Sequence, residues 1–278
     1  MNNPNKEVII NTDQFHKDGY LVVKNVFSEE EIKTFREEAY KQFEIDKTKG
    51  LTYTLPFWKV NANFVNGDLL SKDILNHILL DERILKIAKT ILDSEKLVYF
   101  GDSSYQIGTG SNGFHRDNID RTNLDGPDWK GKYTLIRVGL YLQDHKNYSG
   151  GLKIRKGSHK NRSGEALFVN NEVGDVVVWD LKTLHSGNAV RLKSMPNFSI
   201  NNALIEKSIP EFLRKQKSEE RISLFMTFAL KSSHLDRYIN EYTLKREDTK
   251  THAKASVYDD KVLATAKSKN VEVIQPLS

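Results

Sequence analysis

A histidine and an aspartate stand two positions apart in the segment Phe114–Asn118, which reads Phe-His-Arg-Asp-Asn. If the backbone here is extended, His115 and Asp117 point to the same face, about 6–7 Å apart along the chain. An imidazole nitrogen and a carboxylate oxygen can then take adjacent positions on one metal ion. His185 could bring a second imidazole from a distant part of the chain and complete a three-point ligand set.

Two histidines and one carboxylate that leave coordination positions open form the ligand set typical of non-haem Fe(II) oxygenases. The His-x-Asp spacing alone is a weak indication, because it often arises by chance. A lone histidine such as His185 is also often a satisfied core residue. The spacing gains meaning only from the elements that position it.

The composition restricts the metal sites and the partners. Of the 278 residues, 38% are hydrophobic and 28% charged, as in a globular chain with a substantial core. The absence of cysteine excludes disulfides and thiolate sites, so a metal must be held by nitrogen and oxygen ligands. The net charge of +5 is spread along the chain, which indicates a weak preference for anionic small molecules and not for nucleic acid.

No part of the sequence predicts a targeting or membrane-spanning segment. Residues 1–11 are polar, without an apolar run of signal-peptide length. No stretch approaches the roughly 20 apolar residues that a spanning helix needs. We therefore expect a cytoplasmic protein with no membrane partner. The sequence carries no indication of its oligomeric state.

The first third of the chain is mostly helical by pattern. Residues 20–26 form a short apolar strand. Ser28 and Glu31 then match a capping box at the start of a long amphipathic helix. Two further helices are predicted, one from Ser71 and one capped by Asp81.

From Leu97 onward the pattern changes to short strands separated by Gly, Asn and Asp. The clearest are 98–107, 133–143, 152–156, 175–179 and 222–230. No helical pattern alternates with them, so a doubly wound parallel sheet is not expected. Antiparallel strands behind a helical cover favour a jelly-roll barrel, whose mouth can hold a ligand or a metal.

These patterns predict an α+β protein with a mainly β core, folded as a single domain over residues 1–278. Residues 1–95 form a mainly helical cover, in which the aromatic Phe57 and Trp58 belong to the core. Residues 96–230 form the jelly-roll core, and residues 231–278 form a C-terminal extension.

Five ordered segments between Tyr105 and Leu230 resemble the phytanoyl-CoA dioxygenase family of Fe(II)/2-oxoglutarate-dependent oxygenases. Each segment alone is modest, but their order and approximate spacing match over nearly half of the chain, which makes the set specific. The segments are Phe114-His-Arg-Asp-Asn118, Arg137-Val-Gly-Leu-Tyr-Leu-Gln-Asp144, Gly150-Gly-Leu-Lys-Ile-Arg-Lys-Gly-Ser-His-Lys160, Gly174-Asp-Val-Val-Val-Trp-Asp180 and His185-Ser-Gly-Asn188.

The resemblance implies a double-stranded β-helix, a cupin-like barrel that holds Fe(II) through His115, Asp117 and His185. It also implies that 2-oxoglutarate chelates the iron, and that O2 is consumed, with release of succinate and CO2, while a small-molecule substrate is oxidised. Halogenating relatives lack the carboxylate that Asp117 supplies here, so the resemblance favours hydroxylation.

The arginine that anchors the distal carboxylate of 2-oxoglutarate is where the sequence departs from the family. The family usually places it on a strand shortly after the second histidine, where this chain has Pro196. Arg191, in a loop, is one candidate. Arg221 is the preferred one, because Ser223 lies on the same face and the alternate positions of this strand are wholly apolar. That choice requires residues 192–220 to be an insertion.

Other residues near the expected cavity carry open alternatives. Tyr105 and Gln106 lead into the metal segment, so one of them should face the cavity and contact the cofactor. Arg137 interrupts an apolar strand and either faces the substrate or 2-oxoglutarate, or forms a salt bridge on the outer sheet surface. The insertion and the polar chain after Lys231 are candidates for a lid over the barrel mouth.

Two other functions fit the same residues. A cupin-like metal enzyme could use the three ligands without 2-oxoglutarate, and turnover of 2-oxoglutarate separates the two. A non-catalytic jelly roll could serve as a binding protein, although it would be free to lose one of the ligands. The metal content of the purified protein tests that alternative.

Overall fold

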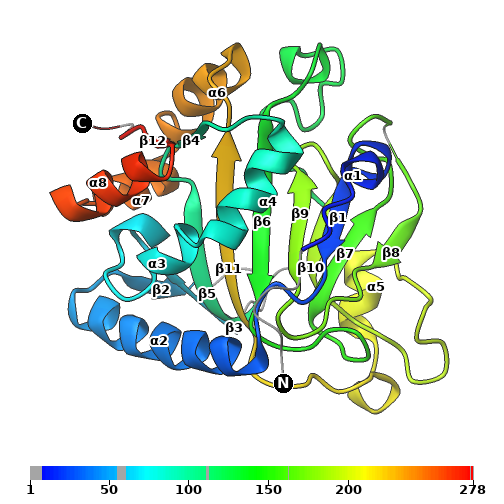
Figure 1. Cartoon of the computed structure of the whole chain (residues 1–278). Helices are drawn as coiled ribbons and strands as arrows, with labels where there is room; N and C mark the ends of the chain where they lie inside the picture. The colour runs from blue at the N-terminus through cyan, green and yellow to red at the C-terminus, as the bar shows by residue number, and fades with distance from the viewer. Residues whose placement is uncertain (1–7, 55–60, 111–112, 162, 276, 278) are drawn as a thin grey trace.

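The computed structural model describes residues 8–54, 61–110, 113–161, 163–275 and 277. Phe57 and Trp58, which the sequence assigns to the core, lie outside these described residues. In the part that is described, two β-sheets and a set of covering helices make up the molecule (Figure 1).

Nine strands form the large sheet within the described residues: β1 (Tyr20–Val23), β2 (Thr52–Thr54), β3 (Asn61–Val65), β4 (Leu97–Tyr99), β5 (Ser103–Thr109), β6 (Leu135–Tyr141), β9 (Val176–Asp180), β11 (Ile222–Ala229) and β12 (Val271–Val273). Their order is β1-β9-β6-β11-β5-β3-β2, with β4 paired to β11 and β12 paired to β4. The small sheet is β10 (His185–Ala189), β7 (Gly151–Arg155) and β8 (Ala166–Phe168), in that order.

The two sheets face each other across an interior that contains a buried apolar cluster. Tyr141 and Trp179 of the large sheet share one buried cluster with Leu152 and Ile154 of the small sheet. Alternate residues of each strand point to opposite faces, so β6, β9 and β11 present one row to this interior and the other row outward. The predicted jelly-roll barrel, a double-stranded β-helix with a mainly β core, is confirmed.

The N-terminal helices cover the outer face of the large sheet (Figure 1). They are α1 (Thr12–Asp18), α2 (Glu29–Thr48), α3 (Asn76–Leu79) and α4 (Glu82–Leu92), with the 3-10 turn η1 (Leu69–Ser71). Ile32 of α2 and Ile84 of α4 pack in one buried cluster with Leu224 of β11. The strand predicted over residues 20–26 is present as β1, whereas β2 and β3 of the large sheet were not predicted in this mainly helical part.

Two of the three predicted helix starts hold. Ser28 and Glu31 form the reciprocal capping box, and the Asp81 side chain accepts a hydrogen bond from the backbone N–H of Arg83. The helix predicted from Ser71 is wrong, because η1 ends there. Lys72 follows with an extended backbone and with its ammonium buried 2.9 Å from Oδ1 of Asp46.

The residues predicted as an insertion lie between β10 and β11. They contain α5 (Ala203–Ser208) and the 3-10 turn η3 (Glu211–Leu213). A wholly buried ion pair fastens them to the small sheet, since Nζ of Lys153 on β7 lies 2.8 Å from both carboxylate oxygens of Glu206 on α5. Residues 192–220 are therefore packed against the barrel wall.

The C-terminal extension is also integrated into the fold. It contains α6 (Ser233–Arg237), the π-helix η4 (Tyr238–Thr243), α7 (Glu247–Lys254) and α8 (Asp260–Ser268), and it ends in β12. β12 pairs in parallel with β4, so the chain closes by joining the large sheet (Figure 1). The expectation of a polar lid is wrong for this part, because Leu235, Tyr238 and Val262 are buried.

Candidate metal centre

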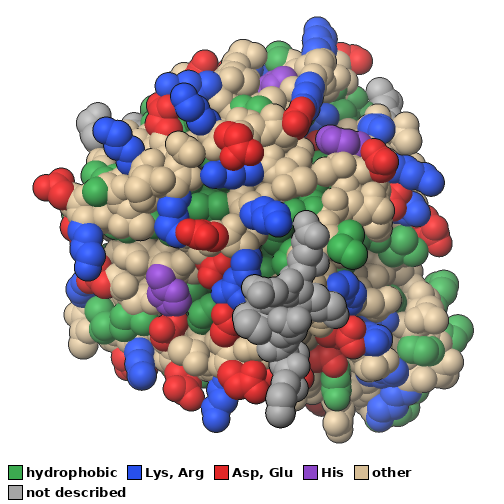
Figure 2. Space-filling model, in the orientation of Figure 1, with side chains coloured by type: hydrophobic (Ala, Val, Ile, Leu, Met, Phe, Trp, Pro, Cys, Tyr) green, Lys and Arg blue, Asp and Glu red, His purple; other side chains and the backbone are tan. Residues whose placement is uncertain are grey.

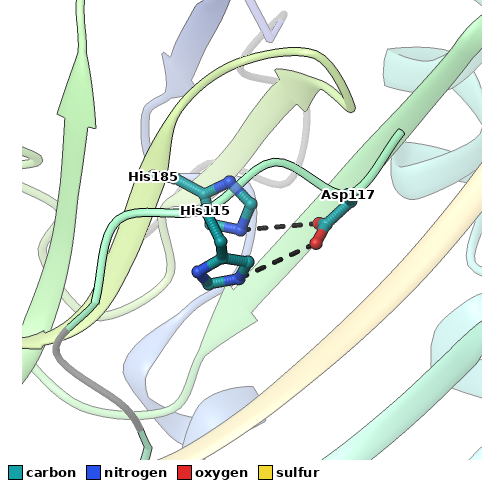
Figure 3. A group of neighbouring side chains, drawn as sticks. All are labelled: His115, Asp117 and His185. Carbon is teal, nitrogen blue, oxygen red and sulfur yellow. Dashed lines mark ion pairs between the residues drawn. The ribbon is translucent and has the colours of Figure 1, made fainter. Parts of the chain in front are cut away.

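His115, Asp117 and His185 converge in the barrel, with their ring nitrogens and carboxylate oxygens directed toward one another (Figure 3). One ligand atom of each residue lies within 4.8 Å of the other two. Nε2 of His185 is 3.4 Å from Oδ2 of Asp117, and Nε2 of His115 is 3.7 Å from Oδ1. The structure thus brings together the three residues selected from the sequence.

Backbone pairing places the two histidines side by side. The N–H of His115 donates to the carbonyl of His185 at 2.9 Å, and the N–H of His185 donates back at 3.0 Å. One step further, the N–H of Asp117 donates to the carbonyl of Leu181 at 2.9 Å. The His-x-Asp segment therefore runs beside the start of β10, which explains how residues 70 positions apart meet.

The hydrogen bonds of the imidazoles fix which nitrogen is free. Nδ1 of His115 lies 3.0 Å from the carbonyl oxygen of Gly113, and Nδ1 of His185 lies 3.0 Å from that of Thr183. A carbonyl oxygen only accepts, so Nδ1 carries the proton in each neutral ring and Nε2 keeps its lone pair. Both lone pairs are on the nitrogens nearest Asp117, as a metal site requires.

Burial differs among the three side chains. The His115 side chain is 47% exposed, whereas those of Asp117 and His185 are 11% and 7% exposed. The centre is therefore reached from the His115 side. Oδ2 of Asp117 is buried, and its charged neighbour among the described residues is the guanidinium of Arg137, 3.0 Å away.

The charges around the centre favour a cation-binding protonation state. Burial would raise the pKa of Asp117, but Arg137 and the two imidazoles outweigh burial, so this pKa lies well below its usual range. Burial lowers the pKa of His185 to about 4, against the opposing effect of Asp117. At neutral pH the carboxylate is charged and the His185 imidazole is neutral, as metal ligation requires.

Arg137 lies beside the three residues. On β6 it pairs with Thr227 of β11 and with Trp179 of β9, so it shares the interior face of the barrel. Its Nη1 lies 3.0 Å from Oδ2 of Asp117. The alternative of a salt bridge on the outer surface is therefore wrong.

Two positions along, Gly139 leaves room for the Trp179 ring, because a Cβ there would lie 2.8 Å from the indole.

A second group of polar atoms lies farther along the same interior face. Nε of Arg221 and Oγ of Ser223 are buried without hydrogen-bond partners among the described residues, and the buried Tyr141 lies beside Arg221. The guanidinium of Arg221 lies 5.4 Å from the centre of the Tyr141 ring, and its Nη1 donates to the carbonyl of Gly108 at 3.4 Å. Burial lowers the pKa of Arg221 against the opposing effect of Tyr141, and no carboxylate of the described residues is among the causes. Such a guanidinium can receive the carboxylate of a ligand.

The sheet register separates Gln106 from Tyr105. Gln106 pairs with Ser223 and lies on the interior face, whereas Tyr105 pairs with Leu224 and lies on the outer face. There the Tyr105 hydroxyl donates to Oδ2 of Asp46 at 2.6 Å, under the helical cover. Tyr105 is thus removed from the candidate site, since its side chain points away from the barrel interior.

Arg191 is buried in other contacts. Its guanidinium donates to the side chain of Asn170 and, at 3.2 Å, to the carbonyl of Pro196, and it stacks 4.2 Å from the centre of the Phe168 ring. These contacts hold the loop after β10 against the small sheet. Arg191 does not join the polar group around Arg221.

Tyr141, Trp179 and Asp102 are neighbours of the site that the sequence did not single out. Tyr141 and Arg137 have the same parity in an otherwise apolar strand, a signal that could have indicated Tyr141. Asp102 carries no such signal, because its contact with Arg137 exists only when β5 and β6 lie in one sheet.

Two surface properties bear on the expected partners. Among the described residues no helix is both long enough and apolar enough to cross a membrane. On the face shown in Figure 2, lysine and arginine side chains are interspersed with aspartate and glutamate, in agreement with the weak charge bias of the sequence.

Comparison with known proteins places this centre in a family. A model of the phytanoyl-CoA dioxygenase (PhyH) family matches residues 15–194, more than half of the chain. The ectoine dioxygenase of Stutzerimonas stutzeri strain A1501 is 24% identical over 151 residues, which cover 54% of this chain and 49% of that protein. The match thus spans about half the length of this curated relative.

Solved structures share the fold. The α-ketoglutarate-dependent epimerase SnoN from nogalamycin biosynthesis superposes with a TM-score of 0.56 at 15% identity, covering 78% of this chain and 79% of SnoN. HygX from Streptomyces hygroscopicus, with nickel and 2-oxoglutarate bound, gives 0.56 at 16% identity, covering 80% and 88%. With the family match over residues 15–194 and the ordered segments around His115, Asp117 and His185, the chain belongs to the phytanoyl-CoA dioxygenase family.

Proposed function

We propose that this protein is a non-haem Fe(II)- and 2-oxoglutarate-dependent dioxygenase that hydroxylates a small-molecule substrate. The observation that carries the proposal is the pairing of two features on one barrel interior. Two imidazoles and a carboxylate converge, and farther along the same face lies a buried arginine without a carboxylate partner in the described chain. Fe(II) with 2-oxoglutarate supplies O2 activation, with release of succinate and CO2.

His115, Asp117 and His185 would hold the metal. Their donor set of two nitrogens and one oxygen, in a chain without cysteine, is that of non-haem Fe(II) enzymes. The hydrogen bonds from both Nδ1 atoms to backbone carbonyls fix the ring orientations in advance. The lowered pKa of Asp117 keeps its carboxylate charged and supports the same assignment.

Arg221 and Ser223 would bind the distal carboxylate of 2-oxoglutarate, with Gln106 on the neighbouring strand facing the same space. A guanidinium offers a planar fork of donors that matches a carboxylate, and the Ser223 hydroxyl can donate a further hydrogen bond. The apolar cluster around Trp179, Leu152 and Ile154 lines the interior between the sheets and excludes water from it.

The substrate is a small molecule, and we propose an anionic one. Arg137 and Arg121 lie close enough to Asp117 to lower its pKa, and either could contribute to binding an anionic group. The net charge of +5 has the same sign. The single-domain organisation and the cytoplasmic location expected from the sequence remain predictions.

Conversion of 2-oxoglutarate to succinate tests the function. The wild-type protein with Fe(II), ascorbate and O2 should form succinate slowly without substrate and faster with a true substrate from a screen of anionic metabolites. Asp117→Ala and His185→Ala should each abolish succinate formation while circular dichroism and thermal unfolding stay close to wild type. Full activity in either variant would remove the ligand assignment. Metal-dependent oxidation without 2-oxoglutarate would favour the cupin-like alternative.

A further inference from the structure

A four-residue polar network connects the candidate metal ligand Asp117 with the C-terminal segment. Nη1 of Arg137 lies 3.0 Å from Oδ2 of Asp117, and its Nη2 donates to Oδ2 of Asp102 at 2.7 Å. The hydroxyl of Tyr238, the first residue of η4, donates to the same oxygen of Asp102 at 3.1 Å. The network therefore joins β6, the turn before β5 and the C-terminal helices.

The backbone and a hydroxyl determine where the guanidinium can lie. Arg137 pairs across the sheet with Thr227, and its Nε donates to Oγ1 of Thr227 at 3.1 Å. With Nε and Nη2 occupied, the planar group has one orientation, and that orientation directs Nη1 to Asp117. A lysine could not reproduce this, because an ammonium is a single point of contact.

The network also balances charge next to a site for a cation. An arginine alone beside a metal would repel it. Asp102, at 2.7 Å, supplies the compensating charge, so that Arg137 and Asp102 together form a nearly neutral pair. Arg137 can then hold Asp117 by direct contact without a large penalty for the metal.

We propose that Arg137 is a positioning residue of the metal centre, which holds the Asp117 carboxylate toward the two imidazoles and is itself aligned by Asp102, Thr227 and Tyr238. This inference rests on the proposed function, since it needs a metal at the three ligands. It gives the C-terminal segment a role in the site through Tyr238, although none of its residues belongs to the ligand set.

Calorimetric titration of Ni(II) into the metal-free protein, without 2-oxoglutarate, tests the proposal. Partners that orient a metal ligand typically contribute 10–100-fold to metal affinity. Arg137→Gln should therefore weaken Ni(II) binding by about 10–100-fold. Arg137→Lys should weaken it less, because the ammonium can still pair with one carboxylate. Asp102→Asn should weaken it too, since the arginine then loses its alignment and its compensating charge.

The matched control is Arg83→Gln. Arg83 is also held between two carboxylates, with Nη2 2.7 Å from Glu31 and 2.8 Å from Asp81, but it lies at the start of α4. Arg83→Gln should leave the Ni(II) affinity unchanged. Any effect that it has measures the general cost of removing an arginine that is paired with two carboxylates. Thermal unfolding of all metal-free variants gives the same comparison for stability.

Three results would overturn the proposal. In the first, Arg137→Gln binds Ni(II) as tightly as wild type, or more tightly, as expected if the arginine only repels the metal. In the second, Ni(II) affinity is unchanged but 2-oxoglutarate affinity at saturating Ni(II) falls, which would make Arg137 a ligand of 2-oxoglutarate. In the third, Arg83→Gln weakens Ni(II) binding equally. If neither Arg137 variant folds, Asp102→Asn decides, and an unchanged Ni(II) affinity refutes the network. A wild-type protein that binds no Ni(II) would instead refute the proposed function.

Discussion

The two arginines that the sequence offers as anchors differ in what surrounds them. Arg191 is satisfied by Asn170, by backbone carbonyls and by the Phe168 ring. Arg221 is equally buried, but its Nε has no hydrogen-bond partner in the described chain. A desolvated guanidinium without a carboxylate partner is unfavourable unless a ligand supplies the counter-charge, so Arg221 is the better anchor.

Replacing the two arginines should therefore give different results. Removal of one partner of a desolvated charge pair costs about 2–5 kcal/mol. Arg221→Ala should raise the 2-oxoglutarate dissociation constant by roughly 30- to several-thousand-fold, with Ni(II) binding unchanged. Arg221→Lys should recover part of that loss. Arg191→Ala should change 2-oxoglutarate affinity little. A large effect of Arg191→Ala without one of Arg221→Ala would transfer the anchor to the loop.

His159 gives a residue-scale prediction about pH. Its Nε2 lies 3.0 Å from the carbonyl of His16, and burial lowers its pKa from 6.5 to about 4. Below pH 6.5 His159 binds a proton in the unfolded chain but stays neutral in the folded chain, so the free energy of unfolding falls as the pH falls. From pH 8 to pH 5 this contributes a loss of about 2 kcal/mol.

Urea unfolding of the metal-free protein at pH 8 and pH 5 measures this effect. His159→Asn should lose about 2 kcal/mol less than wild type over the same interval. Equal losses in both proteins would mean that His159 is not held neutral by its burial.

At the residue scale, the sequence predicts what depends on local spacing. His115 and Asp117 could be selected because a strand places alternate residues on one face. Tyr105 and Gln106 could not be separated, because the choice depends on how β5 aligns with Ser223 and Leu224 of β11. The role of Arg137 also stayed open, since its partner Asp102 is 35 positions away and becomes a neighbour only in the folded sheet.

At the element scale, residues 192–220 are fixed to the barrel by Lys153 and Glu206. Both side chains are at most 1% exposed, and Glu206 also accepts the N–H of Val190 at 2.8 Å. Beside this pair, the Lys153 ammonium lies 5.1 Å from the ring of Phe114, which precedes His115. Residues 192–220 and the segment that carries His115 and Asp117 thus contact the same region of the small sheet.

Breaking that ion pair should destabilise the protein strongly. Lys153→Met leaves Glu206 buried without its counter-charge, which costs about 3–5 kcal/mol. The double variant Lys153→Met with Glu206→Met should regain most of the loss, because two apolar side chains replace the pair. Urea unfolding of the three proteins measures both values. A single variant within about 1 kcal/mol of wild type would show that the pair is screened by water.

The elements that were predicted well are those with strong periodicity or a cap. The helix after Ser28 has both a cap and an amphipathic pattern. The strand from Ile222 has no cap, but its pattern continues over eight residues. β8 and β10 have three and five residues, too few for an alternating pattern to be distinguished from a loop. β10 forms because its backbone pairs with that of β7, with His185 opposite Ile154 and Ser186 opposite Lys153. The local sequence does not encode these contacts.

At the scale of the whole molecule, a helical cover on one side and two facing sheets produce one interior with two polar groups. The jelly-roll class was predictable, because antiparallel strands followed a helical third. The C-terminal part was not, since the apolar positions that it buries, such as Leu235, Tyr238 and Val262, are scattered among charges. Their burial depends on long-range packing, which includes the pairing of β12 with β4 more than 170 positions earlier in the chain.

The central claim is that one interior binds Fe(II) and 2-oxoglutarate together at these residues, and an anaerobic binding titration tests it most directly. We expect one Fe(II) per chain, tighter 2-oxoglutarate binding in its presence, and loss of Fe(II) binding in Asp117→Ala. We also expect Arg221→Ala to keep the Fe(II) stoichiometry and lose 2-oxoglutarate. A wild-type protein that binds neither, or an Asp117→Ala variant that binds both as wild type does, would contradict the account.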